Sequence, residues 1–232
     1  MGDRFNIKVI GLGAGGTHLV HFLAQFLSFR SEETIITLID GDSFEPKNFQ
    51  NQRFRSLGKK AELKKHELRD EFDSLRYRSI SEYVSIDNVH EVIEEGDIVF
   101  LAVDNYATMS LVNTYCRQLD NVVLISGGVD ENHDKEGDVC IFIRRNGNDS
   151  TPDMTYKHPE IANPKDKAPF EMGCDEVIKS HPARLGTVLA VVSWMMSTFM
   201  NYLEGSIDYY EIYFDTSSAK VRKVLIPENY YL

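Results

Sequence analysis

Residues 6–16 read Asn6-Ile7-Lys8-Val9-Ile10-Gly11-Leu12-Gly13-Ala14-Gly15-Gly16, a short apolar run that leads directly into a glycine-rich turn. Apolar residues then recur through residue 29 at the spacing of an amphipathic helix. Residues 34–39 form a second apolar, β-branched run, which Asp40 ends. The stretch therefore predicts a strand, a tight turn, a helix and a second strand, which together form a βαβ unit with parallel pairing.

The remainder of the chain continues this alternation of helix and strand. Helices are predicted at 59–72, 89–95, 106–119 and 185–202, and strands at 77–84, 97–103, 122–125, 138–143, 209–214 and 221–226. The last three strands have the alternation and turns of antiparallel partners. We expect one α/β domain over residues 1–232, a Rossmann-like, doubly wound, mainly parallel sheet with antiparallel strands toward the C-terminus. Residues 146–172 are rich in Asn, Asp, Lys and Pro and predict a mobile loop.

Composition excludes several classes of function. The 232 residues include 25 Lys or Arg and 36 Asp or Glu, a net charge of −11, and this excess of acid disfavours a nucleic-acid partner. The apolar stretch 185–199 contains four hydroxyl residues and is too short for a bilayer span. The N-terminus lacks the plan of a signal peptide. We expect a cytoplasmic protein with no membrane contact.

The cysteines and histidines show no metal-ligand spacing. No two of the three cysteines form a Cys-x-x-Cys pair, so neither a disulfide framework nor a zinc site is expected. Cys116 and Cys140 lie within apolar segments and are interpreted as core residues. Three histidines lie in polar stretches: His133, His158 and His181.

The glycine turn predicts a nucleotide site. Gly11, Gly13 and Gly16 allow a nucleotide to approach the backbone, and the N-terminus of the following helix offers unpaired N–H groups to phosphate. Asp40, at the end of the second strand, is placed to accept hydrogen bonds from ribose hydroxyls. A glycine turn that serves only helix packing, beside an unrelated Asp, is the alternative.

The segment after Asp40 narrows this prediction. It reads Asp40-Gly41-Asp42-Ser43-Phe44-Glu45-Pro46-Lys47-Asn48-Phe49-Gln50-Asn51-Gln52-Arg53, which resembles the Asp-x-Asp, Glu, Asn, Arg-Gln pattern of the ThiF/MoeB adenylyltransferases, the group that includes the ubiquitin-activating enzymes. Further segments resemble this family in the same order: Gly58-Lys59-Lys60-Ala61, residues 97–105 (DIVFLAVDN), residues 122–142, and Gly173-Cys174 before the apolar helix. The resemblance extends from Lys8 to about Leu203.

The resemblance implies ATP-dependent adenylation of the C-terminal carboxylate of a ubiquitin-like or sulfur-carrier protein ending in Gly-Gly, with Mg²⁺ as cofactor and a homodimer as the assembly. Asp40 would hold the ribose, Lys60 would neutralise the phosphates, and Asp104 would carry Mg²⁺. The remaining residues that the resemblance assigns to ATP are Asp42, Asn48, Gln52, Arg53 and Asn105. Cys174 is a candidate nucleophile. Three other lysines are interpreted as a solvated helix face: Lys59, Lys64 and Lys65.

Two positions depart from the family pattern. Asn51 stands where the family has Arg before Gln, and Met109 stands where Arg commonly follows Asp-Asn. If the loop is re-registered, Arg53 takes the place left by Asn51. These departures leave a second hypothesis, a non-catalytic module that docks a ubiquitin-like protein. A third, an NAD-dependent oxidoreductase, lacks support because no Tyr-x-x-x-Lys pair or catalytic His accompanies the turn.

Overall fold

The predicted βαβ unit is confirmed. In the computed structural model, which describes residues 4–30, 33–50, 52–130, 133–171 and 184–230, β1 (Asn6–Ile10) leads into α1 (Ala14–Ser28) and β2 (Ile35–Ile39). The two strands pair in parallel, with Ile10 opposite Ile39. The end of β1 and the end of β2 therefore lie side by side, which places the glycine turn beside Asp40.

The other elements follow the predicted alternation. In chain order they are β3 (Ser43–Phe44), η1 (Pro46–Asn48), β4 (Gly58–Lys59), α2 (Lys60–Glu71), β5 (Arg76–Ile80), α3 (Val89–Val92), β6 (Ile98–Leu101), α4 (Tyr106–Cys116), β7 (Val122–Val129), β8 (Glu136–Arg145), β9 (Asn148–Asp149), η2 (Met154–Tyr156), α5 (Pro159–Ala162), η3 (Pro169–Glu171), α6 (Leu185–Leu203), β10 (Tyr209–Asp215), β11 (Lys220–Leu225) and η4 (Glu228–Tyr230).

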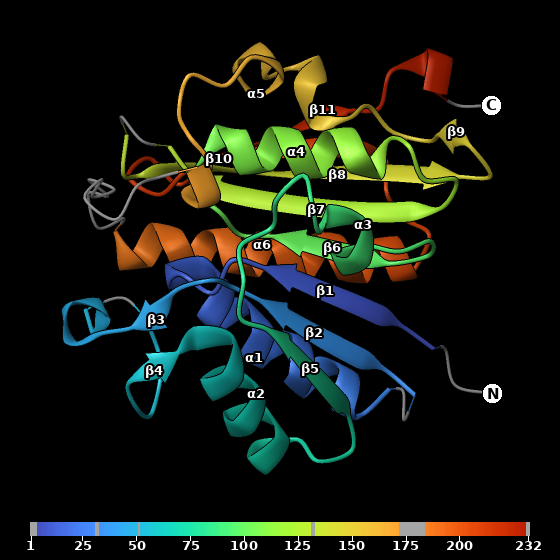
Figure 1. Cartoon of the computed structure of the whole chain (residues 1–232). Helices are drawn as coiled ribbons and strands as arrows, with labels where there is room; N and C mark the ends of the chain where they lie inside the picture. Colours follow the sequence, from blue (N-terminus) through green and yellow to red (C-terminus); the bar gives the residue numbers. More distant parts are fainter. Residues whose placement is uncertain (1–3, 31–32, 51, 131–132, 172–183, 231–232) are drawn as a thin grey trace.

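The main sheet of the described chain has nine strands, eight of them in the order β11-β10-β8-β7-β6-β1-β2-β5, with β9 paired to β8. Strands β7, β6, β1, β2 and β5 run parallel, whereas β8, β10 and β11 are antiparallel. This confirms the predicted Rossmann-like sheet with antiparallel strands toward the C-terminus (Figure 1). Because the chain order reverses on either side of β1, the glycine turn lies at the switch point where open α/β sheets bind ligands.

Helices cover both faces of the sheet (Figure 1). Alternate strand residues point to opposite faces, so Val9 joins the core under α1, α2 and α6, and Ile10 joins the core under α3 and α4. A Cβ on Gly127 would lie 2.8 Å from Val191 of α6, so glycine lets this helix pack directly on β7. The apolar helix predicted from residue 185 is therefore largely a core helix.

The observed elements differ from the predicted bounds where tertiary contacts decide. β7 and β8 extend beyond the predicted 122–125 and 138–143 because they pair over eight residues of β7. Residues 146–172, expected to be a mobile loop, contain β9, η2, α5 and η3, and bury Met154 and Ile161 in the core. The mobility itself stays a prediction. Among the described residues, none of the helices has both the length and the apolarity that a bilayer crossing requires.

Candidate nucleotide site at the glycine turn

The glycine turn is held tightly on its inner side and is open on its outer side. Gly11 has φ +89°, and a Cβ on it would lie 2.5 Å from the carbonyl oxygen of Ala102. A Cβ on Gly16 would lie 1.9 Å from the carbonyl oxygen of Gly11. A Cβ on Gly13 would meet no atom within 4 Å. Gly13 is also the N-cap residue of α1, and no side chain caps this helix. The turn therefore presents the open N-terminus of α1, which suits an anion.

Asp40 is fixed beside this turn. Its side chain is buried, and its two carboxylate oxygens accept hydrogen bonds from the backbone N–H of Leu12 (2.6 Å) and of Asp42 (2.8 Å). The Asp40 N–H donates in turn to the carbonyl oxygen of Ile80 at the end of β5 (3.1 Å). Asp40 thus joins the ends of three neighbouring strands: β1, β2 and β5.

Lys60 is the lysine that points inward. It begins α2, is only 4% exposed, and its Nζ lies 3.0 Å from Oδ2 of Asp42. The neighbouring Lys59 is exposed and donates through Nζ to the carbonyl oxygen of Gly41 (3.0 Å). The sequence leaves open which of the two faces the site, and the structure places Lys60 there.

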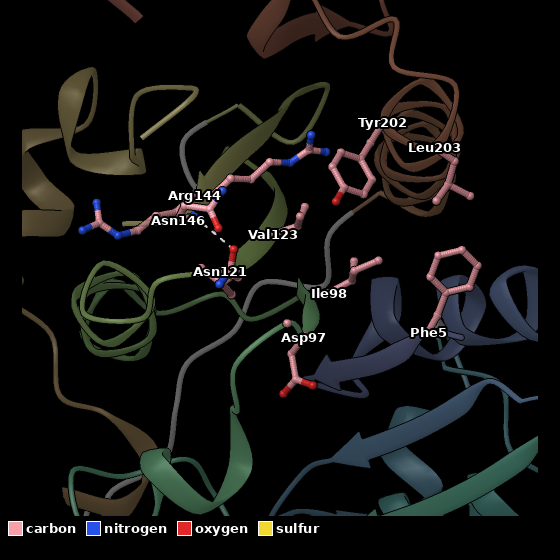
Figure 2. Close-up of a pocket in the computed structure, with 12 residues that line it drawn as sticks. Phe5, Asp97, Ile98, Asn121, Val123, Arg144, Asn146, Tyr202 and Leu203 are labelled. Atoms are coloured by element: carbon pink, nitrogen blue, oxygen red, sulfur yellow. Dashed lines mark hydrogen bonds between the residues drawn. The ribbon is translucent and has the colours of Figure 1, made fainter. Parts of the chain in front are cut away.

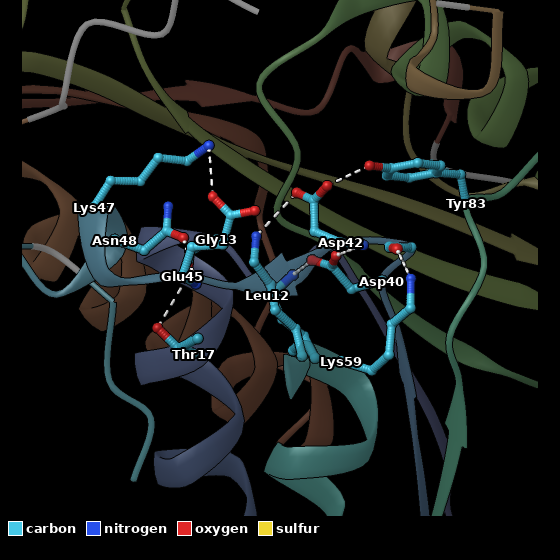
Figure 3. A network of polar contacts seen from close by, with 12 residues as sticks. Leu12, Gly13, Thr17, Asp40, Asp42, Glu45, Lys47, Asn48, Lys59 and Tyr83 are labelled. Carbon is cyan, nitrogen blue, oxygen red and sulfur yellow. Dashed lines mark hydrogen bonds and ion pairs between the residues drawn. The ribbon is translucent and has the colours of Figure 1, made fainter. Parts of the chain in front are cut away.

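Tyr83 completes the cluster and was not predicted. Its ring lies against Gly41, where a Cβ would come within 2.7 Å of the ring atoms, and its hydroxyl donates to Oδ1 of Asp42. Figure 3 shows the hydroxyl of Tyr83 pointing at the carboxylate of Asp42. Tyr83 lies in the irregular segment after β5, so no motif marked it.

The two carboxylates have opposite electrostatic environments. Burial raises the pKa of Asp40, and the charge of Lys60 and two backbone hydrogen bonds oppose this shift in part. Burial also acts to raise the pKa of Asp42, but the hydrogen bond from Tyr83 and the charge of Lys60 outweigh it and lower that pKa. Asp42 is therefore the anionic partner of Lys60, whereas Asp40 is held by the backbone.

The segment after β3 contributes further polar groups. Oδ1 of Asn48 accepts from the N–H of Glu45 (3.0 Å), so Asn48 caps its own 3₁₀ turn, and Figure 3 shows this turn near the glycine turn. Oε1 of Gln52 is buried and has no hydrogen-bond partner within the described chain. Because an unpaired buried carbonyl is unfavourable, Gln52 is suited to accept a hydrogen bond from a bound molecule.

Arg53 lines a cavity that neither Asp42 nor Lys60 helps to form. It is exposed, and the cavity of about 240 Å³ is also formed by His21 of α1 and by Lys64 and Glu71 of α2. Lys64, expected on a solvated face, is buried: its Nζ donates to the carbonyl oxygen of Arg53 and lies 2.6 Å from Oε2 of Glu67. The expectation was wrong for Lys64 because residues 52–57 fold over α2.

Asp104 and Asn105 follow β6. Because β6 pairs with β1, they lie on the same side of the sheet edge as the glycine turn that follows β1. Asp104 is exposed, and its carboxylate makes no hydrogen bond to a described residue. Oδ1 of Asn105 accepts from the N–H of Thr108 (2.8 Å) and caps α4. Asp166 adds a second cap, because its carboxylate accepts from the N–H of Tyr106 and of Ala107 (2.7 and 3.1 Å). The N-terminus of α4 is therefore already occupied by protein groups.

A cavity of about 410 Å³ lies at the other end of the sheet. It is formed at the start of β6 and β7 by residues that include Asp97, Asn121 and Tyr202, and Figure 2 shows their side chains around it. Ligands of open α/β sheets bind at the carboxyl ends of the strands, so this cavity is not the candidate site despite its size. Cys174 and Asn51 lie outside the described residues. Met109 packs against the apolar core beneath α4.

Comparisons with known proteins agree with the fold described above. The sequence profile of the ThiF family matches residues 3–220. A search of curated protein sequences returned no match. E. coli MccB with succinimide has a similar fold, with a TM-score of 0.70 and 18% identity over 96% of this chain and 64% of that one. E. coli MccB with ATP (TM-score 0.67, 18% identity) and PaaA (TM-score 0.66, 15% identity) each match over 96% of this chain and 64% of theirs. The chain thus spans less than two thirds of the length of these structures.

Proposed function

The chain belongs to the ThiF family, and on that basis we propose that it binds ATP over the glycine turn and adenylates the C-terminal carboxylate of a small protein or peptide. The observation that carries this proposal is the uncapped N-terminus of α1, bordered by Asp40 and by the buried Lys60. E. coli MccB has been solved with ATP, and also with AMPCPP and MccA together. The nucleotides and the MccA bound to that protein are consistent with the proposed reaction.

The site supplies what such a reaction requires. The substrate carboxylate attacks the α-phosphorus of ATP, the bond from the α-phosphorus to the bridging oxygen breaks, and pyrophosphate leaves. Two anions must approach each other, so positive charge beside the phosphates lowers the barrier. We assign this charge to Lys60 and to the N–H groups that begin α1. Asp42 holds the Lys60 ammonium in place at 3.0 Å.

Asp40 is suited to the ribose. Each of its oxygens already accepts one backbone hydrogen bond, which fixes the carboxylate, and each retains a lone pair for a sugar hydroxyl. Asn48, Gln52 and Asn105 complete the proposed nucleotide contacts. For Asn105 the contact would be through its amide nitrogen, since its oxygen caps α4.

The residues present also fit a magnesium ion. Asp104 is exposed, and its oxygens make no hydrogen bond within the described chain, so they are available as hard oxygen ligands. When bound there, Mg²⁺ would neutralise part of the phosphate charge.

We further propose that the partner is a ubiquitin-like or sulfur-carrier protein ending in Gly-Gly, and that the chain works as a homodimer. The family resemblance supports the partner. Exposed apolar residues along α6, namely Leu185, Leu189 and Met200, support the dimer. Arg53 and Cys174 are retained as candidates for phosphate contact and for acyl transfer.

Calorimetry with ATP and Mg²⁺, followed by ATP–pyrophosphate exchange in the presence of a small Gly-Gly protein encoded beside the gene, tests the proposal. We expect Lys60→Ala and Asp104→Ala to lower exchange by about 100-fold or more. Lys65→Ala is the matched control, because Lys65 lies on the same helix and pairs only with Glu62 (3.7 Å) in the described chain. No heat on adding ATP, or equal exchange in all three variants, would contradict the proposal.

A second candidate is a module that docks its partner without adenylation. Two observations favour it: Met109, where the family commonly has Arg, packs against the apolar core, and Arg53 lines a cavity that Lys60 does not help to form. Partner binding without pyrophosphate exchange would select this candidate. Binding of NADH in preference to ATP would instead select the oxidoreductase.

A further inference from the structure

Four side chains of metal-ligand type meet on the face of the sheet that α4 and α5 cover. Asp138 and Cys140 are two residues apart on β8 and so point the same way, and Glu211 of β10 pairs with Cys140 directly across the strands. His158, which precedes α5, reaches over them. One ligand atom from each of the four lies within 4.8 Å of all the others.

The distances match a tetrahedral zinc site. Zn–S bonds of about 2.3 Å and Zn–O bonds of about 2.1 Å at the tetrahedral angle give a sulfur-to-oxygen separation of about 3.6 Å. Sγ of Cys140 lies 3.4 Å from Oε1 of Glu211 and 3.7 Å from Oδ2 of Asp138. Nε2 of His158 and Oε1 of Glu211 are in direct hydrogen-bond contact. Nε2 of His158 and Oε1 of Glu211 lie closer together than two atoms that bind the same ion, so binding of an ion would separate them and replace their hydrogen bond.

His158 has the outer partner that metal-binding histidines need. Its Nε2 faces the cluster, and its Nδ1 lies 3.1 Å from Oε1 of Glu160. A hydrogen bond from Nδ1 to this carboxylate leaves Nε2 as the atom with a free lone pair, which is the arrangement found around protein-bound zinc.

The cluster also contains a buried oxygen atom without a hydrogen-bond partner among the described residues. Glu211 is fully buried, and its Oε2 has no hydrogen-bond partner in the described chain. Burial raises the pKa of Asp138 to about 6, and it raises the pKa of the Cys140 thiol as well. Although burial alone acts to lower the pKa of His158, contact with Glu211 raises it to about 9. The carboxylates of the buried Glu211 and the half-buried Asp138 thus face one protonated imidazole, and a divalent cation would balance their charge better.

We propose that Asp138, Cys140, His158 and Glu211 bind one Zn²⁺ ion in a closed structural site. One sulfur, one nitrogen and two oxygens in tetrahedral positions suit Zn²⁺ better than Mg²⁺ or Ca²⁺, which prefer six or more oxygens. The sequence motifs do not predict zinc, because these ligands come from three separate segments rather than from a Cys-x-x-Cys motif.

The ion would attach residues 158–166 to the sheet. His158 is joined through α5 to Asp166, whose carboxylate caps α4 next to Asp104. A zinc-bound His158 would therefore hold in place the segment whose Asp166 caps the start of α4. This inference does not depend on the proposed adenylation, because the ligands and the expected ion are independent of ATP.

Metal analysis of the protein purified without chelator tests the inference directly. We expect about one zinc per chain, and loss of the ion with a lowered Tm after treatment with a strong chelator. Adding Zn²⁺ back should restore the Tm and release about two protons per ion at pH 8, from the Cys140 thiol and the His158 imidazolium. With Co²⁺ in place of zinc, we expect the visible absorption of a tetrahedral site and a thiolate charge-transfer band.

Variants separate binding from folding. Cys140→Ala should abolish the charge-transfer band. Glu160→Gln, which leaves all four ligands, should weaken zinc binding by about 10–100-fold with the fold retained. His133→Gln is the matched control, since His133 is an exposed histidine outside the cluster. The inference is overturned if Zn²⁺ neither binds the chelator-treated protein nor shifts its Tm, or if Cys140→Ala keeps the band.

Discussion

Two neighbouring glycines at the start of α1 should respond in opposite ways to the same substitution. A Cβ on Gly16 would lie 1.9 Å from the carbonyl oxygen of Gly11, whereas a Cβ on Gly15 would meet nothing within 4 Å. In Gly16→Ala the two atoms must separate by about 1.5 Å to reach ordinary contact at about 3.4 Å. Because the obstructing atom belongs to the backbone, the whole start of α1 has to move away from β1.

The magnitude follows from two opposing terms. Crowding of this kind costs about 1–3 kcal/mol, and a backbone obstacle places Gly16→Ala at the upper end. Replacing a helical glycine by alanine returns about 0.5–1 kcal/mol. The net loss is about 2 kcal/mol, which lowers the Tm by about 4–8 °C for a chain of this size. Gly15→Ala receives only the favourable term and should raise the Tm by about 1–4 °C.

Urea denaturation and thermal unfolding of both variants beside the parent protein measure this difference. Circular dichroism at low temperature checks that each variant folds. Equal stability of Gly16→Ala and the parent would refute the reasoning, because it would mean that a methyl group at position 16 does not collide with the carbonyl oxygen of Gly11.

Three further outcomes are expected. The pKa of His158 is raised to about 9, so its contact with Glu211 stabilises the metal-free protein below pH 6.5, and this stabilisation is lost as the pH rises from 6.5 to about 9. His158→Gln should therefore remove the fall in the free energy of unfolding over this pH range, measured by urea denaturation at successive pH values. Lys60→Met should weaken ATP binding by about 10–100-fold in calorimetry, while urea denaturation changes little, since the partner Asp42 is half exposed and remains hydrated. Tyr83→Phe keeps the ring on Gly41 but loses the hydrogen bond to Asp42, so the free energy of unfolding should fall by about 0.5–1.5 kcal/mol, measured by urea denaturation; an unchanged value would show that the bond adds nothing.

Local patterns were enough to predict the frame of the molecule. The βαβ unit, the glycine turn and the position of Asp40 follow from apolar periodicity and from turn chemistry within a few residues. These patterns are reliable because the strands of a parallel sheet are buried on both faces, so the sequence of each strand is a continuous run of apolar residues.

Side chains whose environment comes from distant segments could not be predicted. Lys64 lies in a strongly polar helix, yet residues 52–57 cover it and its Nζ lies 4.5 Å from the centre of the Phe54 ring. Tyr83 reaches Asp42 from a segment 41 residues away. Cys140 and Glu211 are 71 residues apart and are neighbours only because β8 pairs with β10. Residue spacing along the sequence does not predict such long-range contacts.

The position of β5 at the margin of the sheet links ligand binding to local unfolding. Among the described residues this strand pairs only with β2, yet the carbonyl oxygen at its end accepts from the N–H of Asp40 and the chain beyond it leads to Tyr83. Edge strands open more readily than central ones, and each such opening would release both supports of the ribose and lysine contacts at once. A bound nucleotide would oppose that opening. Its presence should therefore slow the exchange of the amide protons of Arg76–Ile80 with solvent, and by a larger factor than it slows the exchange of amide protons in the central strands.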